Sequence, residues 1–477
     1  MAGNLHSITY PDGTVVSMTY DAQNRLTSVG SYVTSILYSP GNDPSTFYYG
    51  NGATQSFSYD ARDRLSGTGS TSYGLDGVGN VGANGYNGVT YGYNGLNELT
   101  GTTGGWLGTT KYTYDTAGNL LSMKENGVTT TLNYPTKDYF NELQNTSVNK
   151  VTKTTYTYDK DGNMITRNGT ACQFYYNDLD KLTKVVKSGQ TVETNVYDGF
   201  GRRISRTVGS VTTTYAYIGD EVLYEQNSTG GTVTGKVLHI YGDGQEVAEV
   251  VNGVTYYPVQ NYVGSIVAVR TGSGATSFSA NYYPWGRISV TKFGSETLKF
   301  TEMPYDSVTG LYFFGTRFYD PTIGRFIQPD SSAGVLSDPL SLNAYAYAGN
   351  NPVTFSDPTG HGWLSDAWNW LQGNWETVAV VGGISAGVAV ACLGIFDCPA
   401  TIAAGGSYIA GILGIGGAAA ADELLPEAEL PDDALVVRGG LNSYINNISE
   451  QFTLHEYSLL IPLASRRATE LDNPVES

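Results

Sequence analysis

The sequence predicts a mainly β protein in which short β-hairpins follow one another and stack into a curved shell. A turn motif recurs along the first two hundred residues, tyrosines alternate along the strand before each turn, and copies lie about twenty residues apart. Because a single hairpin cannot bury its own apolar face, neighbouring hairpins must pack against each other to form a core.

The turn motif is clearest in YTYDTAGNLLS, residues 112–122. Asp115 can accept hydrogen bonds from the backbone N–H groups that follow it, and Gly118 suits the positive φ of a tight turn. The fourth position is always Asn, Asp or Gly, which enter the left-handed region most readily. The seven copies are Asp21/Asn24, Asp60/Asp63, Asn94/Asn97, Asp115/Gly118, Asp159/Gly162, Asn177/Asp180 and Asp198/Gly201. An apolar residue five positions after the first starts the next strand in six copies, whereas Ile204 stands one position later in the seventh.

Tyrosines stand at alternate positions before the turns, as in Tyr112 and Tyr114 or Tyr156 and Tyr158. Successive side chains of a strand point to opposite faces, so these rings form a stripe on one face. We expect this stripe to be a packed ladder of rings. A flat platform on which sugars stack is the alternative interpretation.

The composition is typical of many short strands joined by tight turns, since the 477 residues include 60 Gly and 37 Tyr and only 15% are charged. The formal net charge of −18 disfavours nucleic acid as a partner, because the field repels polyphosphates. Three Cys cannot form a disulfide framework, and four scattered His give no cluster of metal ligands. We therefore expect neither a metal nor another cofactor.

The opening residues, MAGNLHSITYPDG, lack the basic and apolar regions of a secretory signal. Export is therefore expected to use a dedicated system. The chain also starts close to the middle of a repeat, which predicts a fragment, or a downstream start, of a longer protein.

From residue 305 the sequence changes to YDSVTGLYFFGTRFYDPTIGRFIQPD, and a spacer leads to LNAYAYAGNNPVTFSDPTGH. The first stretch resembles the core segment of the Rhs family of YD-repeat proteins. The positions that carry the resemblance are Tyr305, Asp306, Gly310, Leu311, Tyr312, Arg317, Tyr319, Asp320, Pro321, Gly324, Arg325 and Phe326. Together with the upstream tyrosine–aspartate repeats, the resemblance covers residues 1–361.

This resemblance implies a bacterial shell that winds into a hollow cocoon, with the core segment as a plug and a variable C-terminal domain, commonly a toxin, inside. Similar proteins are the toxin-complex C subunits and the Rhs effectors of contact-dependent secretion machines, and teneurins use the shell for adhesion. The implied partners are the chain's own C-terminal domain, a delivery machinery, an immunity protein and a target membrane. The implied location is outside the producing cell or at its surface. A cell-surface adhesin or carbohydrate-binding protein is the alternative function.

The resemblance also implies self-cleavage beside a DPxG motif, in which aspartates act as general acid and base on the peptide bond. Asp357 in DPTG matches the second motif of the family. The first motif departs from the pattern, because Asp330 stands in PDSSAG and Asp338 stands in DPLS without the glycine. His361 follows DPTG where the family usually has Leu. The other interpretation of Asp357 is a turn former.

After residue 361 the composition shifts. Four tryptophans with helix-like spacing (Trp363, Trp368, Trp370 and Trp375) precede two uncharged stretches, 378–396 and 400–421, each long enough to span a bilayer as a helix. Three interpretations stay open: a helical hairpin that inserts into a target membrane, a Gly/Ala-rich segment stored in the shell, and a permanent anchor.

Residues 422–433, DELLPEAELPDD, are expected to be an acidic linker, since two prolines block a continuous helix. The stretch ALVVRGGLNS (434–443) is similar to the first conserved strand of ADP-ribosyltransferase toxins, which implies an NAD-binding role for Arg438. No Glu-x-Glu pair follows, so a complete transferase is not expected.

The predicted order is YD-type repeats over 1–300 and the core segment over 301–361. A Trp-rich and hydrophobic helical region over 362–421, the linker and a truncated toxin-type domain over 434–477 complete it. The fold class is thus a β-hairpin shell, expected to be incomplete, followed by a short α-helical hydrophobic hairpin and a small tail.

Overall fold

The structure is a computed structural model that describes residues 4–82, 85–137, 139, 141–219, 221–292, 298–331, 334 and 339–361, all within one compact unit. The expectations for the tryptophans, the uncharged stretches, the acidic linker and Arg438 lie outside the described residues, as does Asp338. In the part of the chain that is described, no helix is long and apolar enough to cross a membrane.

The first hairpins form an eight-stranded antiparallel sheet in which strands adjacent in sequence are adjacent in space. Its strands are β1(Ser7–Thr9), β2(Val15–Tyr20), β3(Leu26–Val29), β4(Val33–Tyr38), β5(Pro44–Tyr49), β6(Thr54–Tyr59), β7(Leu65–Thr68) and β8(Thr71–Ser72).

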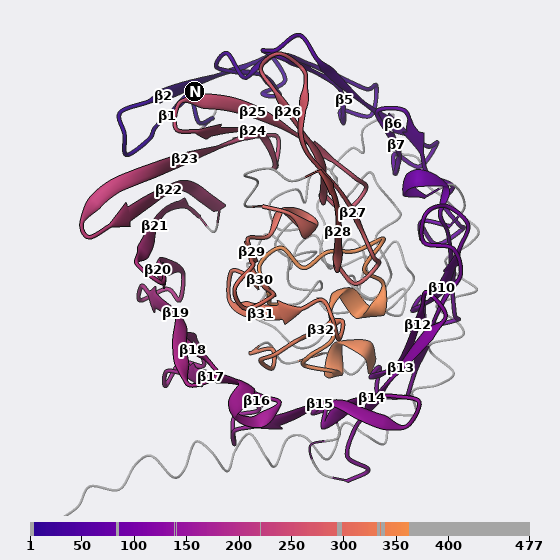
Figure 1. The fold of residues 1–477 in the computed structure, drawn as a ribbon. Coiled ribbons are helices and arrows are strands. Elements are labelled where there is room, and N and C mark those ends of the chain that lie inside the picture. Colours follow the sequence, from indigo (N-terminus) through magenta and orange to yellow (C-terminus); the bar gives the residue numbers. More distant parts are fainter. Residues whose placement is uncertain are drawn as a thin grey trace, which may run out of the picture. The chain divides into compact units, whose positions relative to one another are not determined.

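The next strands, β9 to β28, close into an antiparallel barrel (Figure 1), here called the wall. They are β9(Thr90–Tyr93), β10(Leu99–Thr103), β11(Thr110–Tyr114), β12(Leu120–Glu125), β13(Val128–Asn133), β14(Asn145–Val148), β15(Val151–Tyr158), β16(Met164–Arg167), β17(Cys172–Tyr176), β18(Leu182–Lys187), β19(Gln190–Tyr197), β20(Arg203–Val208), β21(Val211–Ile218), β22(Glu221–Thr229), β23(Thr232–Gly242), β24(Gln245–Val251), β25(Val254–Gln260), β26(Ile266–Thr271), β27(Thr276–Tyr282) and β28(Ile288–Lys292).

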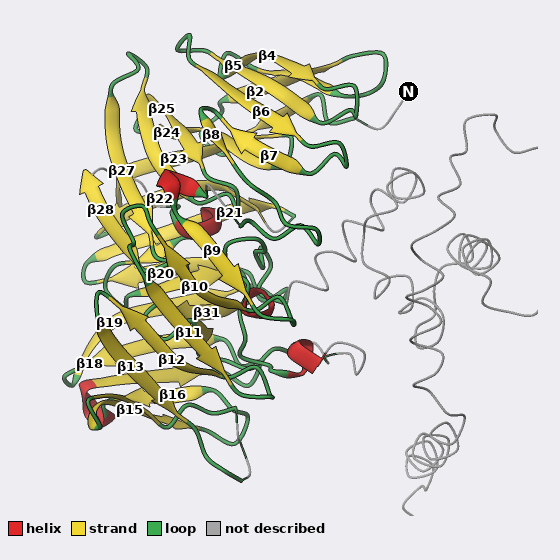
Figure 2. Ribbon diagram, turned by 90° about the vertical axis from the view of Figure 1, so that its right-hand side faces the viewer, coloured by secondary structure: helices red, strands yellow, loops and turns green. Residues whose placement is uncertain are grey.

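The described residues of 298–361, here called the plug, form a separate four-stranded sheet that lies inside the ring of wall strands (Figure 1). Its strands are β29(Tyr305–Asp306), β30(Leu311–Phe314), β31(Arg317–Asp320) and β32(Arg325–Phe326). Short 3-10 helices complete the chain: η1(Tyr86–Gly88), η2(Gly169–Ala171), η3(Phe300–Glu302), η4(Pro339–Leu342) and η5(Ala348–Asn350). The side view in Figure 2 shows how fully strands dominate the described chain. The mainly β, hairpin-repeat fold class is therefore confirmed, and the wall closes within the described residues.

The predicted turn chemistry is confirmed in all seven copies. The fourth residues all have positive φ: Asn24 (63°), Asp63 (54°), Asn97 (63°), Gly118 (73°), Gly162 (86°), Asp180 (56°) and Gly201 (81°). In the copy that starts at Asp115, the carboxylate oxygen Oδ1 accepts the N–H groups of Ala117 and Asn119, both at 2.9 Å. Two further copies, at Asp76/Gly79 and Asn261/Gly264, were absent from the sequence prediction.

The tyrosines join each hairpin to the one before it. Tyr114 pairs across its turn with Leu120, and its ring packs on the core of the barrel. Its hydroxyl donates to the carbonyl of Leu99, which follows the preceding turn. The same link recurs as Tyr38 to Leu26, Tyr93 to Val81, Tyr134 to Leu120, Tyr176 to Met164, Tyr197 to Leu182, Tyr217 to Arg203 and Tyr282 to Ile266. The repeated tyrosine thus contributes both apolar area and a hydrogen bond between repeats.

The seventh turn explains the displaced Ile204. Tyr197 pairs with Arg203, which is buried, whereas Ile204 is 38% exposed. The guanidinium of Arg203 lies 4.2 Å from the ring centroid of Phe313 in the plug and 5.2 Å from that of Tyr215 in the wall. A cation sandwiched between aromatic rings replaces the apolar side chain of the other copies.

Two cores hold the sheets together. The first lies between the wall and the plug, where Trp285, Leu311 and Phe318 pack with the inward side chains of β10 to β18. The second lies between the eight-stranded sheet and β22 to β25, where Phe47 and Val33 pack with Ile240. The strands β23 and β24 are consequently covered on both faces.

Candidate functional site at the plug

The plug brings two of the predicted aspartates together. Nη2 of Arg317, in β31, lies 2.9 Å from Oδ2 of Asp330 and 3.0 Å from Oδ2 of Asp357. Arg317 also donates to the carbonyl of Ala344 and covers the ring of Phe326 at 3.7 Å. Asp357 is fully buried, so the guanidinium balances a carboxylate that water does not reach. Sequence reasoning did not identify Arg317 as the residue that joins the pair.

The DPTG segment is held in one conformation. Gly360 has φ +69°, and a Cβ at this position would lie 2.2 Å from the carbonyl oxygen of Phe314, so only glycine fits. The hydroxyl of Thr316 lies 3.0 Å from the carbonyl oxygen of Thr359 and 2.7 Å from that of Gly360. Burial lowers the pKa of the adjacent His361, although Asp330 acts in the opposite direction. Asp357 opens a turn, since its carbonyl accepts the N–H of Gly360, and its carboxylate contacts Arg317.

The plug also contacts a row of wall turns through side-chain donors. These donors come from four short stretches of the plug and reach five turns of the wall. The pairs are Asn351 to Asn80 Oδ1 (2.7 Å), Asn350 to Glu98 Oε1 (3.0 Å) and Gly118 O (2.8 Å), Asn343 to Asn119 Oδ1 (3.0 Å), Tyr345 to Gly162 O (2.7 Å) and Gln328 to Asp180 O (2.9 Å). We call the turns 76–80, 94–98, 115–119, 159–163 and 177–181 the covered turns.

The fifth residue of each turn decides how it meets its surroundings. In four of the five covered turns the fifth residue is Asn80, Glu98, Asn119 or Asn163, each at most 2% exposed. In the turn 177–181 it is Lys181, whose ammonium donates to the carbonyl of Thr316 in the plug. In the turns 21–25, 60–64 and 198–202, here called the open turns, the fifth residue is an arginine whose side chain is 28% to 32% exposed. This change from Arg to Asn or Glu is visible in the sequence, and it was the signal that could have located the plug contacts.

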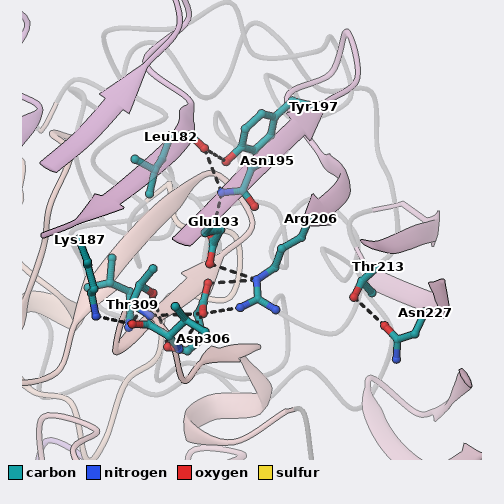
Figure 3. Close-up of polar contacts among 12 residues, drawn as sticks. Leu182, Lys187, Glu193, Asn195, Tyr197, Arg206, Thr213, Asn227, Asp306 and Thr309 are labelled. Carbon is teal, nitrogen blue, oxygen red and sulfur yellow. Dashed lines mark hydrogen bonds and ion pairs between the residues drawn. The ribbon is translucent and has the colours of Figure 1, made fainter. Parts of the chain in front are cut away.

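A third contact joins plug and wall through two carboxyl groups (Figure 3). Glu193 of β19 and Asp306 of β29 both contact the guanidinium of Arg206, at 3.2 Å and 3.1 Å from Nε. Burial and the neighbouring Asp306 raise the pKa of Glu193 to about 8. Burial acts in the same direction on Asp306, but the hydrogen bond from Glu193 and the charge of Arg206 outweigh it and lower the pKa of Asp306. Glu193 therefore carries the proton that the two carboxyls share.

The plug contains two Tyr-Asp pairs, Tyr305–Asp306 and Tyr319–Asp320, and the aspartate of the second pair also contacts an arginine of the wall. Asp320 accepts from Arg167 of β16 at 2.8 Å, and the same guanidinium donates to the carbonyl of Thr309 at 2.9 Å. Lys187 donates to the carbonyl of Val308. Both Tyr-Asp pairs of the plug thus end on arginines of the wall, and the plug is tied to β16 and β20 by buried charge pairs. A buried pair specifies position strongly because breaking it leaves an uncompensated charge.

Known proteins resemble this chain over both its repeats and its wall. The teneurin YD-shell family profile matches residues 80–353, and the RHS repeat profile matches residues 1–31. The tRNA3(Ser)-specific nuclease WapA of Bacillus spizizenii is 36% identical over 204 residues, which are 41% of this chain and 8% of that protein. Toxin subunit YenC1 of Yersinia entomophaga is 26% identical over 209 residues, 38% of this chain and 21% of that protein. The chain thus spans a small part of the length of these relatives.

Solved structures share the fold. The Photorhabdus luminescens Tc holotoxin pore matches with a TM-score of 0.62 at 21% identity, covering 75% of this chain and 21% of that one. A TcdB2–TccC3 crystal structure matches with a TM-score of 0.54 at 20% identity and the same coverage. The matched YD-shell profile spans more than half of the chain, from residue 80 to residue 353, and so includes the wall strands and most of the plug. This protein therefore belongs to the Rhs/YD-repeat shell family.

Proposed function

We propose that this chain is the closing part of a toxin-delivery shell. In this proposal the wall encloses, the plug seals one end, and the segment after residue 361 is the cargo that is carried to a competing bacterium or a host cell. A shortened toxin-type domain over 434–477, export by a dedicated machinery and an immunity protein in the producing cell belong to the same proposal. The observation that carries it is the plug, whose asparagine side chains hydrogen-bond to the turns of the wall.

Two further observations support a delivery shell over an adhesin. Relatives that match about two fifths of this chain include a nuclease and a toxin subunit by name. The tyrosines that an adhesin would offer to sugars are packed against the barrel core, and their hydroxyls donate to backbone carbonyls. Stacked sugars need free ring faces, so these tyrosines favour a structural role.

Proteolysis of the native full chain tests the enclosure. We expect residues 362–477 to resist protease while the plug is docked and to become digestible in Arg317→Met, which loosens it. Arg64→Met, at an open turn, is the matched control and should leave the digestion pattern unchanged. Rapid digestion of 362–477 in the unaltered protein would refute enclosure. Expression of residues 362–477 in a naive host separately tests the cargo, and normal growth would speak against a toxic tail.

We also propose that Asp330 and Asp357 cleave the chain next to the DPTG turn. Two carboxylates meet on one guanidinium beside a peptide segment that Thr316 and Gly360 hold fixed, and fixed geometry is the first requirement for attack on a peptide bond. In this proposal Arg317 is a positioning residue. The neutral form of His361, favoured by burial, lies beside the same segment.

A denaturing gel of the purified protein tests this cleavage. We expect two fragments that separate near residue 361, and a single full-length band in Asp357→Asn and in Asp330→Asn. Asp178→Asn, at an exposed turn position, controls for loss of a carboxylate. A single intact band from the unaltered protein would leave Asp357 as a turn former and refute self-cleavage, without bearing on enclosure.

A further inference from the structure

A buried acid cluster lies where the start of the plug meets the wall, away from the aspartate pair. The strands β22, β23 and β24 contribute Glu225, His239, Glu246 and Glu249, each at most 6% exposed. Glu302 enters the cluster from η3 of the plug. These groups are not used by the enclosure or the cleavage.

Both ring nitrogens of His239 contact carboxylates. Nδ1 lies 2.6 Å from Oε1 of Glu246, and Nε2 lies 3.3 Å from Oε1 of Glu225. A histidine that meets an acceptor on each side is suited to carry two protons. Burial lowers the pKa of His239, but Glu246 and Glu225 outweigh it, so the pKa stands well above its ordinary value.

Glu302 connects the plug to this cluster. Its Oε1 accepts from the backbone N–H of Glu246 at 3.0 Å and from the side chain of Gln260. Thr301 and Glu302 both have positive φ, 48° and 60°, a conformation that non-glycine residues rarely adopt twice in succession. The backbone accepts this strain while the side chain of Glu302 points into the wall.

The cluster holds more negative than positive groups. Among the described residues, the four carboxyls of Glu225, Glu246, Glu249 and Glu302 face two cations, His239 and Lys299, which precedes η3. Both cations act against burial and Glu246, which raise the pKa of Glu249. The second carboxylate oxygen of Glu246, Oε2, is buried without a partner in the described structure. Carboxyls that outnumber their cations in a buried site must retain protons.

Further polar groups of the described residues face the cluster from neighbouring elements. From the eight-stranded sheet, Tyr10 donates to the carbonyl of His239 at 2.9 Å. The ring of Tyr241 lies in β23, and nearby Glu221 adds further negative charge. Burial and the acidic neighbours Glu246 and Glu221 raise the pKa of Glu302, and they outweigh the hydrogen bonds from Gln260 and from the backbone N–H of Glu246, which lower it.

We propose that this cluster is a proton-dependent latch that fastens the start of the plug to the wall. The docked state takes up protons that the undocked state releases, because undocking returns Glu302 and Glu249 to water. Burial and Glu246 raise the pKa of Glu249 to about 8, and burial and Glu246 raise that of Glu302 well above its ordinary value. The latch is therefore tight in acid and loosens as pH rises.

The direction in which pH changes the stability of docking follows from proton linkage. A carboxyl with an ordinary pKa when undocked and a raised pKa when docked stabilises docking below its ordinary pKa, and this contribution is lost as pH rises through the docked value. The loss for Glu249 falls between about pH 4.5 and pH 8. Within that window, opening becomes about tenfold easier per pH unit for each proton released.

Hydrogen exchange on the full chain tests the latch. The amide of Thr301 bonds to the hydroxyl of Ser265, and the amide of Ile266 bonds to the carbonyl of Lys299, so both cross the contact and their exchange reports its opening. After correction for the intrinsic exchange rate, we expect protection to fall about tenfold per pH unit per released proton from pH 5 to pH 8. Glu302→Gln, which imitates the protonated side chain, should lower this slope by one proton, and Glu249→Gln should do the same.

The exposed Asp178→Asn should keep the slope of the unaltered protein. Protection that stays constant between pH 5 and pH 8 in the unaltered protein would overturn the latch, even if a glutamine variant failed to fold. An unchanged slope in both folded glutamine variants would overturn it as well.

Discussion

The covered and the open turns have the same backbone but meet different surroundings. In both, the first residue accepts N–H groups from the third and fifth residues, as Asp21 does from Gln23 and Arg25, and Asp115 from Ala117 and Asn119. The difference is confined to the fifth side chain. The first and fourth residues therefore determine the conformation of the turn, and the side chain of the fifth residue determines which contacts the turn makes with its surroundings.

Each kind of fifth residue also links its turn to the next. At the open turns, the arginine bonds back to its own aspartate and onward, as Arg25 does to Asp21 and to Asn42. At the covered turns, an asparagine makes both links with one short amide, as Asn80 does to Asp76 and Asn97. The amide oxygen is then left over for the plug. An arginine in place of these asparagines would occupy the space that the plug needs, whereas Lys181 of the turn 177–181 reaches the carbonyl of Thr316 in the plug.

The largest expected effect comes from the guanidinium shared by Asp330 and Asp357. Arg317→Met removes the cation that faces two carboxylates, one of them fully buried, and should lower the free energy of unfolding by about 3–5 kcal/mol. Arg64→Met breaks the exposed pair with Asp60 and should cost about 0–1 kcal/mol. Urea denaturation of both variants measures the difference. Equal effects would mean that the plug and the open turns are not energetically distinct.

Exchanging the fifth residues between a covered and an open turn tests whether this residue determines the contact with the plug. Asn119→Arg places a long charged side chain under Asn343 of the plug, where the asparagine is 1% exposed, and overpacking plus lost hydrogen bonds should cost about 3 kcal/mol. The reverse exchange, Arg202→Asn, lies on an open turn and should cost about 1 kcal/mol or less. Urea denaturation and protease accessibility of the plug measure both. If Asn119→Arg were tolerated as well as Arg202→Asn, the fifth residue would not encode plug contact.

Much of the wall could be predicted from the sequence because its signals are local. A turn needs Asp or Asn first and a residue able to reach positive φ fourth, and each signal lies within five residues. The turn at Asp76 escaped because its strand β8 is short and ends before the usual tyrosine pattern resumes. Closure of the wall could not be predicted, since it depends on the summed curvature of many strands and on no single residue.

The site was predictable only in part, for the same physical reason. Asp330 and Asp357 are identified by their motif, but their meeting on Arg317 joins residues 13 and 40 positions away in the chain. Glu193 and Asp306 lie in two different sheets and meet at Arg206, and no local sequence pattern around either residue indicates this contact. Contacts that depend on tertiary placement leave only indirect marks in a sequence, such as the change of the fifth turn residue.

A smaller effect is expected from the amide ladder. Asn343→Ala removes the donors to Asn119 Oδ1 and to the carbonyl of Ala117, and buried acceptors without donors should cost about 2 kcal/mol. Asn4→Ala removes a comparable amide contact, to Asn24 of an open turn, where water can replace it, and should cost about 0.5 kcal/mol or less. Urea denaturation again compares them. A larger loss from Asn4→Ala would contradict the role of burial.

The smallest effect is expected from removing the hydroxyl of a repeated tyrosine, either under the plug or near the surface. The hydroxyl of Tyr176 donates to the carbonyl of Met164 at 2.8 Å beneath the plug, and that of Tyr20 donates to the carbonyl of Leu5 at 2.9 Å near the surface. Tyr176→Phe keeps the ring and should cost about 1 kcal/mol, because the buried carbonyl loses its donor. Tyr20→Phe should cost less, because water reaches the carbonyl of Leu5 once the hydroxyl is gone. Thermal unfolding of both variants resolves this difference if the transitions are cooperative. Since the geometry of the two hydrogen bonds is nearly the same, any difference in stability measures the plug above Tyr176 and not the repeat itself.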